Sequence, residues 1–165
     1  MNSNETLITS FYEAFQRRDH AGMIDCYHPS IHFSDPVFTD LRGNEAKAMW
    51  HMLCERGTDL DVTFRDVQAD DNEGRAHWEA RYTFLRGSRP VHNIVDASFV
   101  FQDGLIIRHT DTFDLWRWTR MAIGPAGTAL GWSGPFQSKV RATAMGGLRK
   151  FVAGHPEYGE PSELG

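Results

Sequence analysis

Apolar residues in the first thirty positions recur every three or four residues, which is the spacing of a helix that buries one face. A first helix is predicted to end near Arg18. Its apolar face comprises Leu7, Ile8, Phe11, Tyr12 and Phe15. Asp19 is suited to cap a short second helix, which stops at His28 because Pro29 disfavours helical geometry in the residue before it. The apolar residues of this second helix are Met23, Ile24 and Tyr27.

A short strand is predicted over residues 31–35, and a third helix follows it. This helix begins after Gly43, has Asn44 as its cap and ends at Gly57. A last helix is predicted over residues 136–152, after a stretch rich in Gly and Pro from residue 124 to 135. Its apolar stripe is made of Val140, Ala144, Leu148 and Phe151.

Between residues 60 and 115 the spacing of apolar residues changes from helical to alternating, which predicts strands. The alternation forms four runs, separated by turns at Asp70–Gly74, Gly87–Pro90 and Asp103–Gly104, so the strands form an antiparallel meander. A change of phase between Phe64 and Val67 indicates a β-bulge. The last strand places one set of side chains on a single face: Ile107, His109, Asp111, Phe113 and Leu115.

This order of elements predicts a single α+β domain, and 165 residues leave room for one domain with a real core. Strands of this length twist and bend, so we expect a curved antiparallel sheet around the three N-terminal helices, with an apolar pocket open at one end. Residues 1–123 are assigned to this domain. Residues 124–165 are assigned to a Gly/Pro-rich connection and a helix that packs on the same domain or on a dimer partner.

Charge and composition exclude several classes of protein. A net charge of −5 and a pI near 5.9 argue against a general nucleic-acid surface. The polar N-terminus lacks the pattern of a signal peptide, and no apolar run approaches the length of a membrane helix. Cys26 and Cys54 fall within apolar helical patterns and are expected to be buried thiols in a reducing cytoplasm. We therefore expect a cytoplasmic protein with no nucleic-acid or membrane partner.

Two motifs carry a family resemblance. The first is IHFSDPV at residues 31–37, followed by Gly43 and preceded by RDHAGMI at residues 18–24. The second is DGLIIRHTDTF at residues 103–113. Together with the element order over residues 5–118, they resemble the NTF2-like superfamily, in particular its SnoaL-like and ketosteroid-isomerase-like members. The resemblance implies a cone-shaped fold that commonly dimerises, with Asp35 as the catalytic base and Asp111 as a general acid/base.

The chain departs from ketosteroid isomerase at the groups that stabilise the dienolate, which are a Tyr and a protonated Asp in that enzyme. Phe11 occupies the Tyr position, and Tyr12 lies one residue away, about 100° around the helix. Ala97 occupies the acid position, and Asp96 beside it is expected on the opposite face of the sheet. Both donors are therefore expected to be missing, which weakens the steroid isomerase interpretation.

Three residues are the candidates for catalysis: Asp35, His109 and Asp111. An aromatic-lined pocket would raise the pKa of Asp35 into the range of a useful base, whereas the alternative is an Asp-Pro turn. His109 and Asp111 are two residues apart in one strand, so both face the same side, with Cβ atoms about 7 Å apart. They form either a proton-transfer pair or a structural hydrogen bond at the end of the sheet.

The candidates for substrate binding are mostly aromatic. They are Asn93, Trp50, Trp78, Tyr82, Phe11, Phe15 and Phe113. Rigid aromatic faces suit a flat apolar ligand, and a buried amide can donate to a carbonyl. Ordinary core packing for each aromatic, and a tie to a neighbouring strand for Asn93, are the alternatives.

No metal or cofactor is expected. The nearest pair of histidines, His28 and His32, is separated by Pro29 and matches no metal-ligand spacing. A nucleophile elbow and a phosphate-binding Gly loop are both absent from the sequence.

These patterns predict a cofactor-independent isomerase or cyclase that moves a proton next to a carbonyl of a small hydrophobic molecule. The alternatives are a non-catalytic binding protein and an enzyme that hydrolyses an epoxide with an Asp-activated water. The aromatic run Trp116-Arg117-Trp118 is expected on the convex face of the sheet, where a second copy of the chain would bury it in a homodimer. The last helix could instead cover this patch within the monomer, or act as a lid over the pocket.

Overall fold

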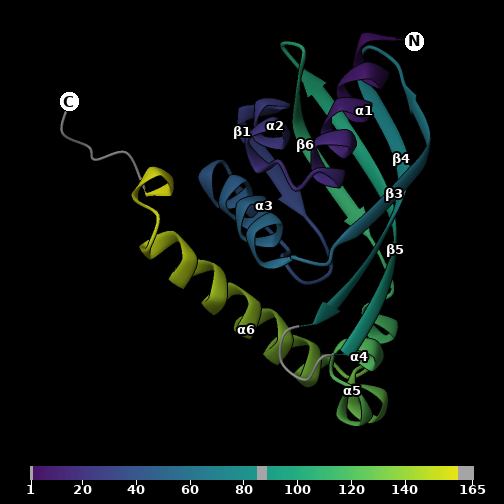
Figure 1. The fold of residues 1–165 in the computed structure, drawn as a ribbon, viewed down its shortest axis with the longest axis vertical. Helices are drawn as coiled ribbons and strands as arrows, with labels where there is room; N and C mark the ends of the chain where they lie inside the picture. The colour runs from purple at the N-terminus through teal and green to yellow at the C-terminus, as the bar shows by residue number, and fades with distance from the viewer. Residues whose placement is uncertain (1, 85–88, 160–165) are drawn as a thin grey trace.

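The computed structural model describes residues 2–84 and 89–159 and shows an α+β fold with a curved, open sheet (Figure 1). Three helices precede the long strands and three α-helices follow them. In chain order the elements are α1 (Ser3–Gln16), α2 (His20–Asp25), β1 (Tyr27–Ser34), β2 (Leu41–Arg42), α3 (Asn44–Arg56), β3 (Asp61–Ala69), β4 (Glu73–Phe84), β5 (Arg89–Gln102), β6 (Leu105–Thr112), α4 (Leu115–Ala122), α5 (Pro125–Leu130), α6 (Gly134–Ala153) and the 3₁₀ turn η1 (Pro156–Tyr158).

The six strands form one sheet in the order β2-β1-β6-β5-β4-β3, which confirms the predicted fold class and the meander of four long strands. All neighbouring strands are antiparallel except β1 and β6, which are parallel. The chain leaves β1, passes through α3 and the meander, and returns beside β1 as β6. This return places the IHFSDPV segment next to the last strand of the meander.

α1 buries the face that the sequence pattern predicts. Asn2 begins the helix, because its side chain accepts a hydrogen bond from the backbone N–H of Asn4 while Glu5 accepts one from the backbone N–H of Asn2. The helix packs against β3 and β4 (Figure 1). Its core residues, all at most 2% exposed, are Ile8, Phe11, Tyr12, Ala14 and Phe15.

Some predicted boundaries are wrong because pairing across the sheet overrides the local pattern. The second helix ends at Asp25, and Tyr27 starts β1 by pairing with Ile106. Gly43, rather than Asn44, is the N-cap of α3. A register shift between Val100 and Phe101 turns Ile106, instead of Ile107, into the core. The bulge predicted after Phe64 is present as a register shift between Arg65 and Gln68.

The chain beyond β6 differs most from the prediction. β6 ends at Thr112, so Leu115 and both Trp116 and Trp118 lie in α4 instead of on the sheet. Trp118 donates a hydrogen bond to the hydroxyl of Tyr82 over 2.8 Å. The exposed large apolar residues beyond β6 are Trp116, Leu130 and Trp132, on or just after α4 and α5. The predicted homodimer stays a prediction.

The stretch rich in Gly and Pro contains the short helix α5, which the sequence pattern did not predict. The predicted last helix is present as α6 and packs on α3 of the same chain, with Leu148 and Phe151 buried. Figure 1 shows α6 running from the end of the sheet that carries α4 and α5 toward α3. Of the turn predicted at Gly87–Pro90, the first two residues lie outside the described residues, while Pro90 belongs to β5. Within the described residues, no helix is long and apolar enough to cross a membrane.

Gly43 carries a backbone conformation that other residues rarely adopt, with φ of +53° and ψ of −119°. A Cβ at this position would meet its nearest neighbour, the carbonyl oxygen of Pro29, at an ordinary 3.5 Å. The requirement for Gly therefore comes from the backbone dihedral angles and not from crowding.

We expect Gly43→Ala to lower the free energy of unfolding by about 1–3 kcal/mol through this strain, measured by urea denaturation. Gly146→Ala is the matched control, because Gly146 lies in α6 with open space around it. That change should be neutral or stabilise the protein by about 0.5–1 kcal/mol. Equal destabilisation by both variants would contradict the role of Gly43.

Candidate functional site

The centre of the fold is a buried pair formed by His109 and Asp111 on β6. Nε2 of His109 lies 2.9 Å from Oδ1 of Asp111, and the two residues are 0% and 3% exposed. As expected from their spacing, both side chains project to the same, inner face of the sheet. A carboxylate and an imidazole removed from water need hydrogen-bond partners, and the structure supplies them from three other elements.

A continuous chain of hydrogen bonds runs through this pair. The indole Nε1 of Trp50 on α3 donates to the hydroxyl of Tyr27 over 2.8 Å, and this hydroxyl lies 2.7 Å from Nδ1 of His109. At the other end, Nε1 of Trp78 on β4 lies 3.3 Å from Oδ1 of Asp111. An indole N–H only donates and a carboxylate only accepts, so Nε2 of His109 carries a proton. With a neutral imidazole, Tyr27 donates its own proton to Nδ1.

Aromatic rings enclose His109 on several sides. The imidazole centroid lies 4.5 Å from the ring of Phe99, 5.1 Å from Phe33 and 5.4 Å from Phe11, and it stacks on Trp50 at 6.0 Å. The pair therefore contacts protein groups instead of a surface open to solvent. This arrangement has the features of a structural hydrogen-bond network at the heart of the domain.

Asp35 follows β1 directly and caps the turn after it. Its Oδ1 accepts hydrogen bonds from the backbone N–H groups of Val37 and Phe38 over 2.7 and 2.6 Å, and its own N–H donates to the carbonyl of Phe38. The predicted Asp-Pro turn is thus present. Among the described residues none is hydrogen-bonded to Oδ2, which leaves this oxygen available to a ligand.

The pKa of Asp35 is raised from 3.8 to about 7. Burial of the carboxyl is the largest cause; the charge of Asp111 also raises the pKa, against the lowering effect of the hydrogen bonds from Phe38 and Val37. The residue as a whole keeps some exposed surface, although its carboxyl is largely surrounded by protein. Asp35 thus combines structural hydrogen bonds at one oxygen with a proton affinity suited to chemistry near neutral pH.

Tyr12 is a buried polar residue that the sequence analysis set aside. It is 0% exposed, and its hydroxyl has no hydrogen-bond partner among the described residues. Burial is the largest cause that raises its pKa, and the charges of Asp111 and Tyr27 raise it further, which places the hydroxyl close to the network. Its burial agrees with the sequence analysis, because positions 8, 11, 12 and 15 form one stripe that includes Tyr12 as well as Phe11.

The predicted ligand-binding residues divide into two groups. Four of them pack around the buried network as core: Phe11, Phe15, Trp50 and Trp78. Asn93 is buried on the inner face of β5, and no described residue is hydrogen-bonded to its amide. Tyr82 lies on β4, whereas the half-buried Phe113 lies just after the end of β6 and not on the strand where the sequence placed it. Burial raises the pKa of Tyr82, and the charge of Asp35 adds to this effect. Asp35, Tyr82 and Asn93 are thus the polar candidates outside the sealed centre.

Two hollows of the described surface are lined mainly by residues of β3, β4 and β5, with volumes of about 370 and about 570 Å³. The first is lined by Asp59, Asp61, Arg81, Tyr82, Thr83, Pro90, Val91, His92 and Met121. The second is lined by Arg65, Asp66, Gln68, Arg75, Ala76, His77, Asp96 and Ala97. The apolar pocket predicted on the inner face of the sheet stays a prediction.

We expect Asp111→Ala to lower the free energy of unfolding by about 3–5 kcal/mol, because it leaves the buried N–H groups of His109 and Trp78 without an acceptor. Asp96→Ala is the control, since this exposed carboxylate also pairs with a histidine, at 3.0 Å from Nδ1 of His77. The control should change stability by no more than about 1 kcal/mol. Urea denaturation measures both, and similar losses would contradict a structural role for the buried pair.

The raised pKa of Asp35 also predicts a pH dependence of stability. The carboxyl of Asp35 releases its proton near pH 3.8 in the unfolded chain and near pH 7 in the folded protein. The stabilisation that comes from protonated Asp35 is therefore complete below about pH 4 and is lost as the pH rises through about 7. Asp35→Asn keeps an acceptor for the two backbone N–H groups and cannot ionise. Its stability relative to the wild type should rise by up to about 4 kcal/mol between pH 4 and 8. Thermal unfolding across this range tests it, and a constant difference would disprove the shift.

Comparison with known proteins gives the same fold. The chain superimposes with a TM-score of 0.64 on an NTF2-like protein of unknown function from Burkholderia pseudomallei K96243, at 17% identity over 74% of this chain and 98% of that chain. An LEH-like epoxide hydrolase from M. tuberculosis gives 0.62 at 17% identity, covering 79% and 97%. A candidate polyketide cyclase from Xanthomonas campestris pv. campestris gives 0.57 at 22% identity, covering 71% and 94%. At these identities the structures share the fold alone.

No curated protein has significant similarity to the chain. The family model for the SnoaL-like domain matches residues 8–109, which run from the inner face of α1 to His109 in the buried pair. This match covers most of the described sheet and the three helices packed against it. The chain therefore belongs to the SnoaL-like domain family, within the NTF2-like fold.

Proposed function

We propose that this protein is a cofactor-independent enzyme that moves a proton next to a carbonyl group of a small hydrophobic molecule, with Asp35 as the general base. The observation that carries the proposal is the pKa of Asp35, raised to about 7 by burial. A base with this pKa is half ionised at neutral pH and gains enough proton affinity to attack a weakly acidic C–H bond. An ordinary exposed carboxylate, with a pKa near 4, is a much weaker base.

The hydrogen bonds of Asp35 support this role. Oδ1 is held by the N–H groups of Val37 and Phe38, so the carboxyl has one orientation. Oδ2 has no such partner among the described residues and is the oxygen that would receive the proton. A fixed base with one free oxygen limits the positions from which a substrate can react.

His109 and Asp111 act in this proposal without contacting the substrate. The negative charge of Asp111 contributes to the raised pKa of Asp35, and the network around His109 holds that charge in place. Both are positioning residues, because the aromatic rings of the core enclose them. This assignment modifies the proton relay that the sequence alone predicted for the pair.

Asn93 is the group we propose for the substrate carbonyl. Its amide faces the inner side of the sheet outside the sealed centre, and no described residue is hydrogen-bonded to it. An amide N–H can donate to a carbonyl oxygen and stabilise the negative charge that develops there. The hydroxyl of Tyr12 also has no partner among the described residues, but it is enclosed in the core beside the buried network and is not assigned to the substrate. Asn93 would take the place of the Tyr and Asp that ketosteroid isomerase uses, at another position in the fold.

The similar structures support a class of chemistry and leave the reaction open. One is named a candidate polyketide cyclase and another an epoxide hydrolase. Water activation for epoxide opening would use the same Asp35. Of the neighbouring charges, the negative charge of Asp111 raises the pKa of Asp35, whereas a cation placed between two acids would lower it. The guanidinium of Arg141 on α6 donates through Nε to the carbonyl of Pro36, next to Asp35 in the chain, and not to the carboxyl of Asp35. Carbonyl-linked proton transfer is therefore the better supported reaction.

The test is exchange of α-hydrogens for deuterium in D₂O, followed by NMR on a panel of apolar cyclic ketones. This assay detects proton abstraction without requiring the natural product. We expect the wild type to accelerate exchange, with a rate that rises with pH through about 7 as Asp35 ionises. Asp35→Asn should lower the enzymatic rate by about 10²–10⁴.

Asp40→Asn is the matched control, because Asp40 is exposed and lies five residues further along the chain. It should leave the rate unchanged. Saturable binding of a ketone without exchange of its α-hydrogens would contradict the proposed enzyme and support the alternative, a non-catalytic binding protein. Exchange that survives Asp35→Asn would show that another group is the base.

A further inference from the structure

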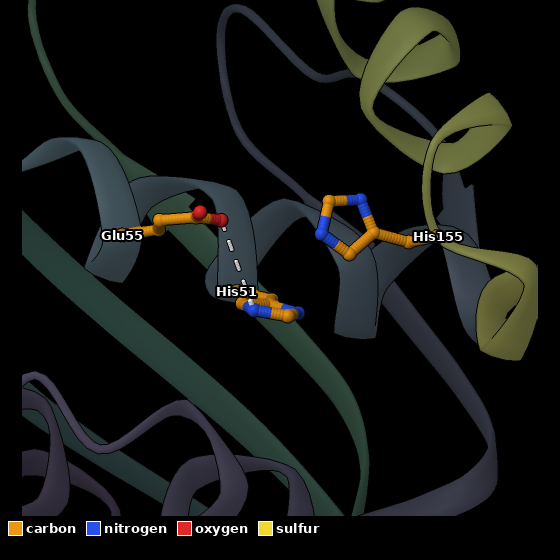
Figure 2. Close-up of side chains that lie close together, drawn as sticks. All are labelled: His51, Glu55 and His155. Carbon is orange, nitrogen blue, oxygen red and sulfur yellow. Dashed lines mark ion pairs between the residues drawn. The ribbon is translucent and has the colours of Figure 1, made fainter.

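A second cluster of titratable side chains lies on the opposite side of α3, away from the sheet. His51 and Glu55 are one helical turn apart on α3, and His155 lies just after α6 (Figure 2). Nε2 of His51 is 3.9 Å from Oε2 of Glu55, and one potential ligand atom from each of the three residues lies within 4.8 Å of the other two. Figure 2 shows the ring of His155 directed from the C-terminal segment toward the two side chains of α3.

Hydrogen bonds fix which nitrogen of each imidazole is free. Nδ1 of His155 lies 2.7 Å from the carbonyl oxygen of Phe151, which only accepts, so Nδ1 carries the proton and Nε2 keeps its lone pair. Nδ1 of His51 lies 2.8 Å from the hydroxyl of Tyr158, to which it can donate, and this leaves Nε2 free on the side of Glu55. An imidazole that donates through one nitrogen and offers the other is the usual state of a metal-bound histidine.

Stacking also holds both rings in place. His51 stacks on His20 of α2, with centroids 3.6 Å apart and an interplanar angle of 10°. His155 stacks on Phe151, with centroids 3.8 Å apart and an angle of 17°. Glu55 and Glu157 bring negative charge close to the ring of His51.

We propose that His51, Glu55 and His155 form a binding site for a divalent transition-metal ion of the zinc class. Two imidazole nitrogens and one carboxylate oxygen are a donor set that Zn²⁺ and Co²⁺ accept, with a fourth position left for water. Ligands at about 2.0–2.1 Å in a tetrahedral site are about 3.3 Å apart, so the widest separation of 4.8 Å must close by about 1.5 Å. Glu55 is exposed, with 58% of its side chain accessible, so its carboxylate can move toward the two imidazoles. A small shift of the segment that carries His155 would close the distance between the rings.

The ion would join two segments far apart in the sequence. His51 and Glu55 come from the middle of the domain, whereas His155 belongs to the segment that follows α6. Binding would therefore fasten the end of α6 to α3 and stabilise the docked C-terminal segment. A site of this composition differs from the pair His28 and His32, which the sequence analysis considered.

The test is titration of the full chain, without a polyhistidine tag, with Zn²⁺ by calorimetry and with Co²⁺ by visible absorption. We expect one ion per chain, the d–d absorption of a low-coordinate Co²⁺ site, and a melting temperature that rises with Zn²⁺ and returns with a chelator. Glu55→Gln and His155→Gln should each weaken the affinity for Zn²⁺ by about 10–100-fold or more. Because the side chain of Glu55 is exposed, Glu55→Gln removes a ligand without disturbing the packing of α6. A weaker affinity for Zn²⁺ in this variant therefore reports loss of the ligand and not undocking of α6.

Glu45→Gln and His28→Gln are the matched controls. Glu45 is an exposed residue in the first turn of the same helix, and His28 lies on β1. Both variants should bind Zn²⁺ as the wild type does. Absence of stoichiometric binding would overturn the proposal, and so would an affinity that Glu55→Gln and His155→Gln leave unchanged.

Discussion

The structure depends on the buried contact between Asp111 and His109. A carboxylate that is 3% exposed is tolerated in an apolar core only when donors surround it. His109 and Trp78 supply them, His109 is in turn paired with Tyr27, and Tyr27 accepts from Trp50. One polar chain thus joins β4, β6, β1 and α3, and each of these elements must take a specific position for the next group to be satisfied. The network specifies how the sheet and the third helix meet, which hydrophobic packing alone does less sharply.

The same contact links the core to the candidate chemistry. Asp35 directly follows β1, the strand that begins with Tyr27. Because β1 pairs with β6, the carboxyl of Asp35 comes close enough to Asp111 for that charge to raise its pKa. Burial and this neighbouring charge favour the protonated form, whereas the N–H groups of the turn favour the ionised form. A pKa of about 7 is the balance of these opposing effects. Asp111, which contributes to the raised pKa of Asp35, therefore also belongs to the network that joins the elements of the fold, and a substitution of Asp111 alters both.

Local periodicity predicted much of this arrangement. The stripe on α1, the meander of four long strands and the common face of His109 and Asp111 follow from spacings of 3.6 and 2 residues, which need no knowledge of distant contacts. Tyr27 was placed at the end of a helix, because its role depends on pairing with Ile106, almost eighty residues away. The burial of Tyr12 was predicted from its position in the apolar stripe, but comparison with one enzyme set it aside as a hydrogen-bond donor. The register shift at Val100 and the helix α4 likewise depend on tertiary packing.

α3 takes part in both clusters through neighbouring residues. Trp50 points into the core and donates to Tyr27, while His51, about 100° further around the helix, faces α2 and the end of α6. The sequence shows only a histidine and a glutamate one turn apart, and the third donor arrives through the docking of α6. An ion bound at His51 would restrain α3 from its outer side and thereby hold Trp50 against the hydroxyl of Tyr27. The proposed metal site would then act on the buried network through the rigidity of one helix, without contacting it.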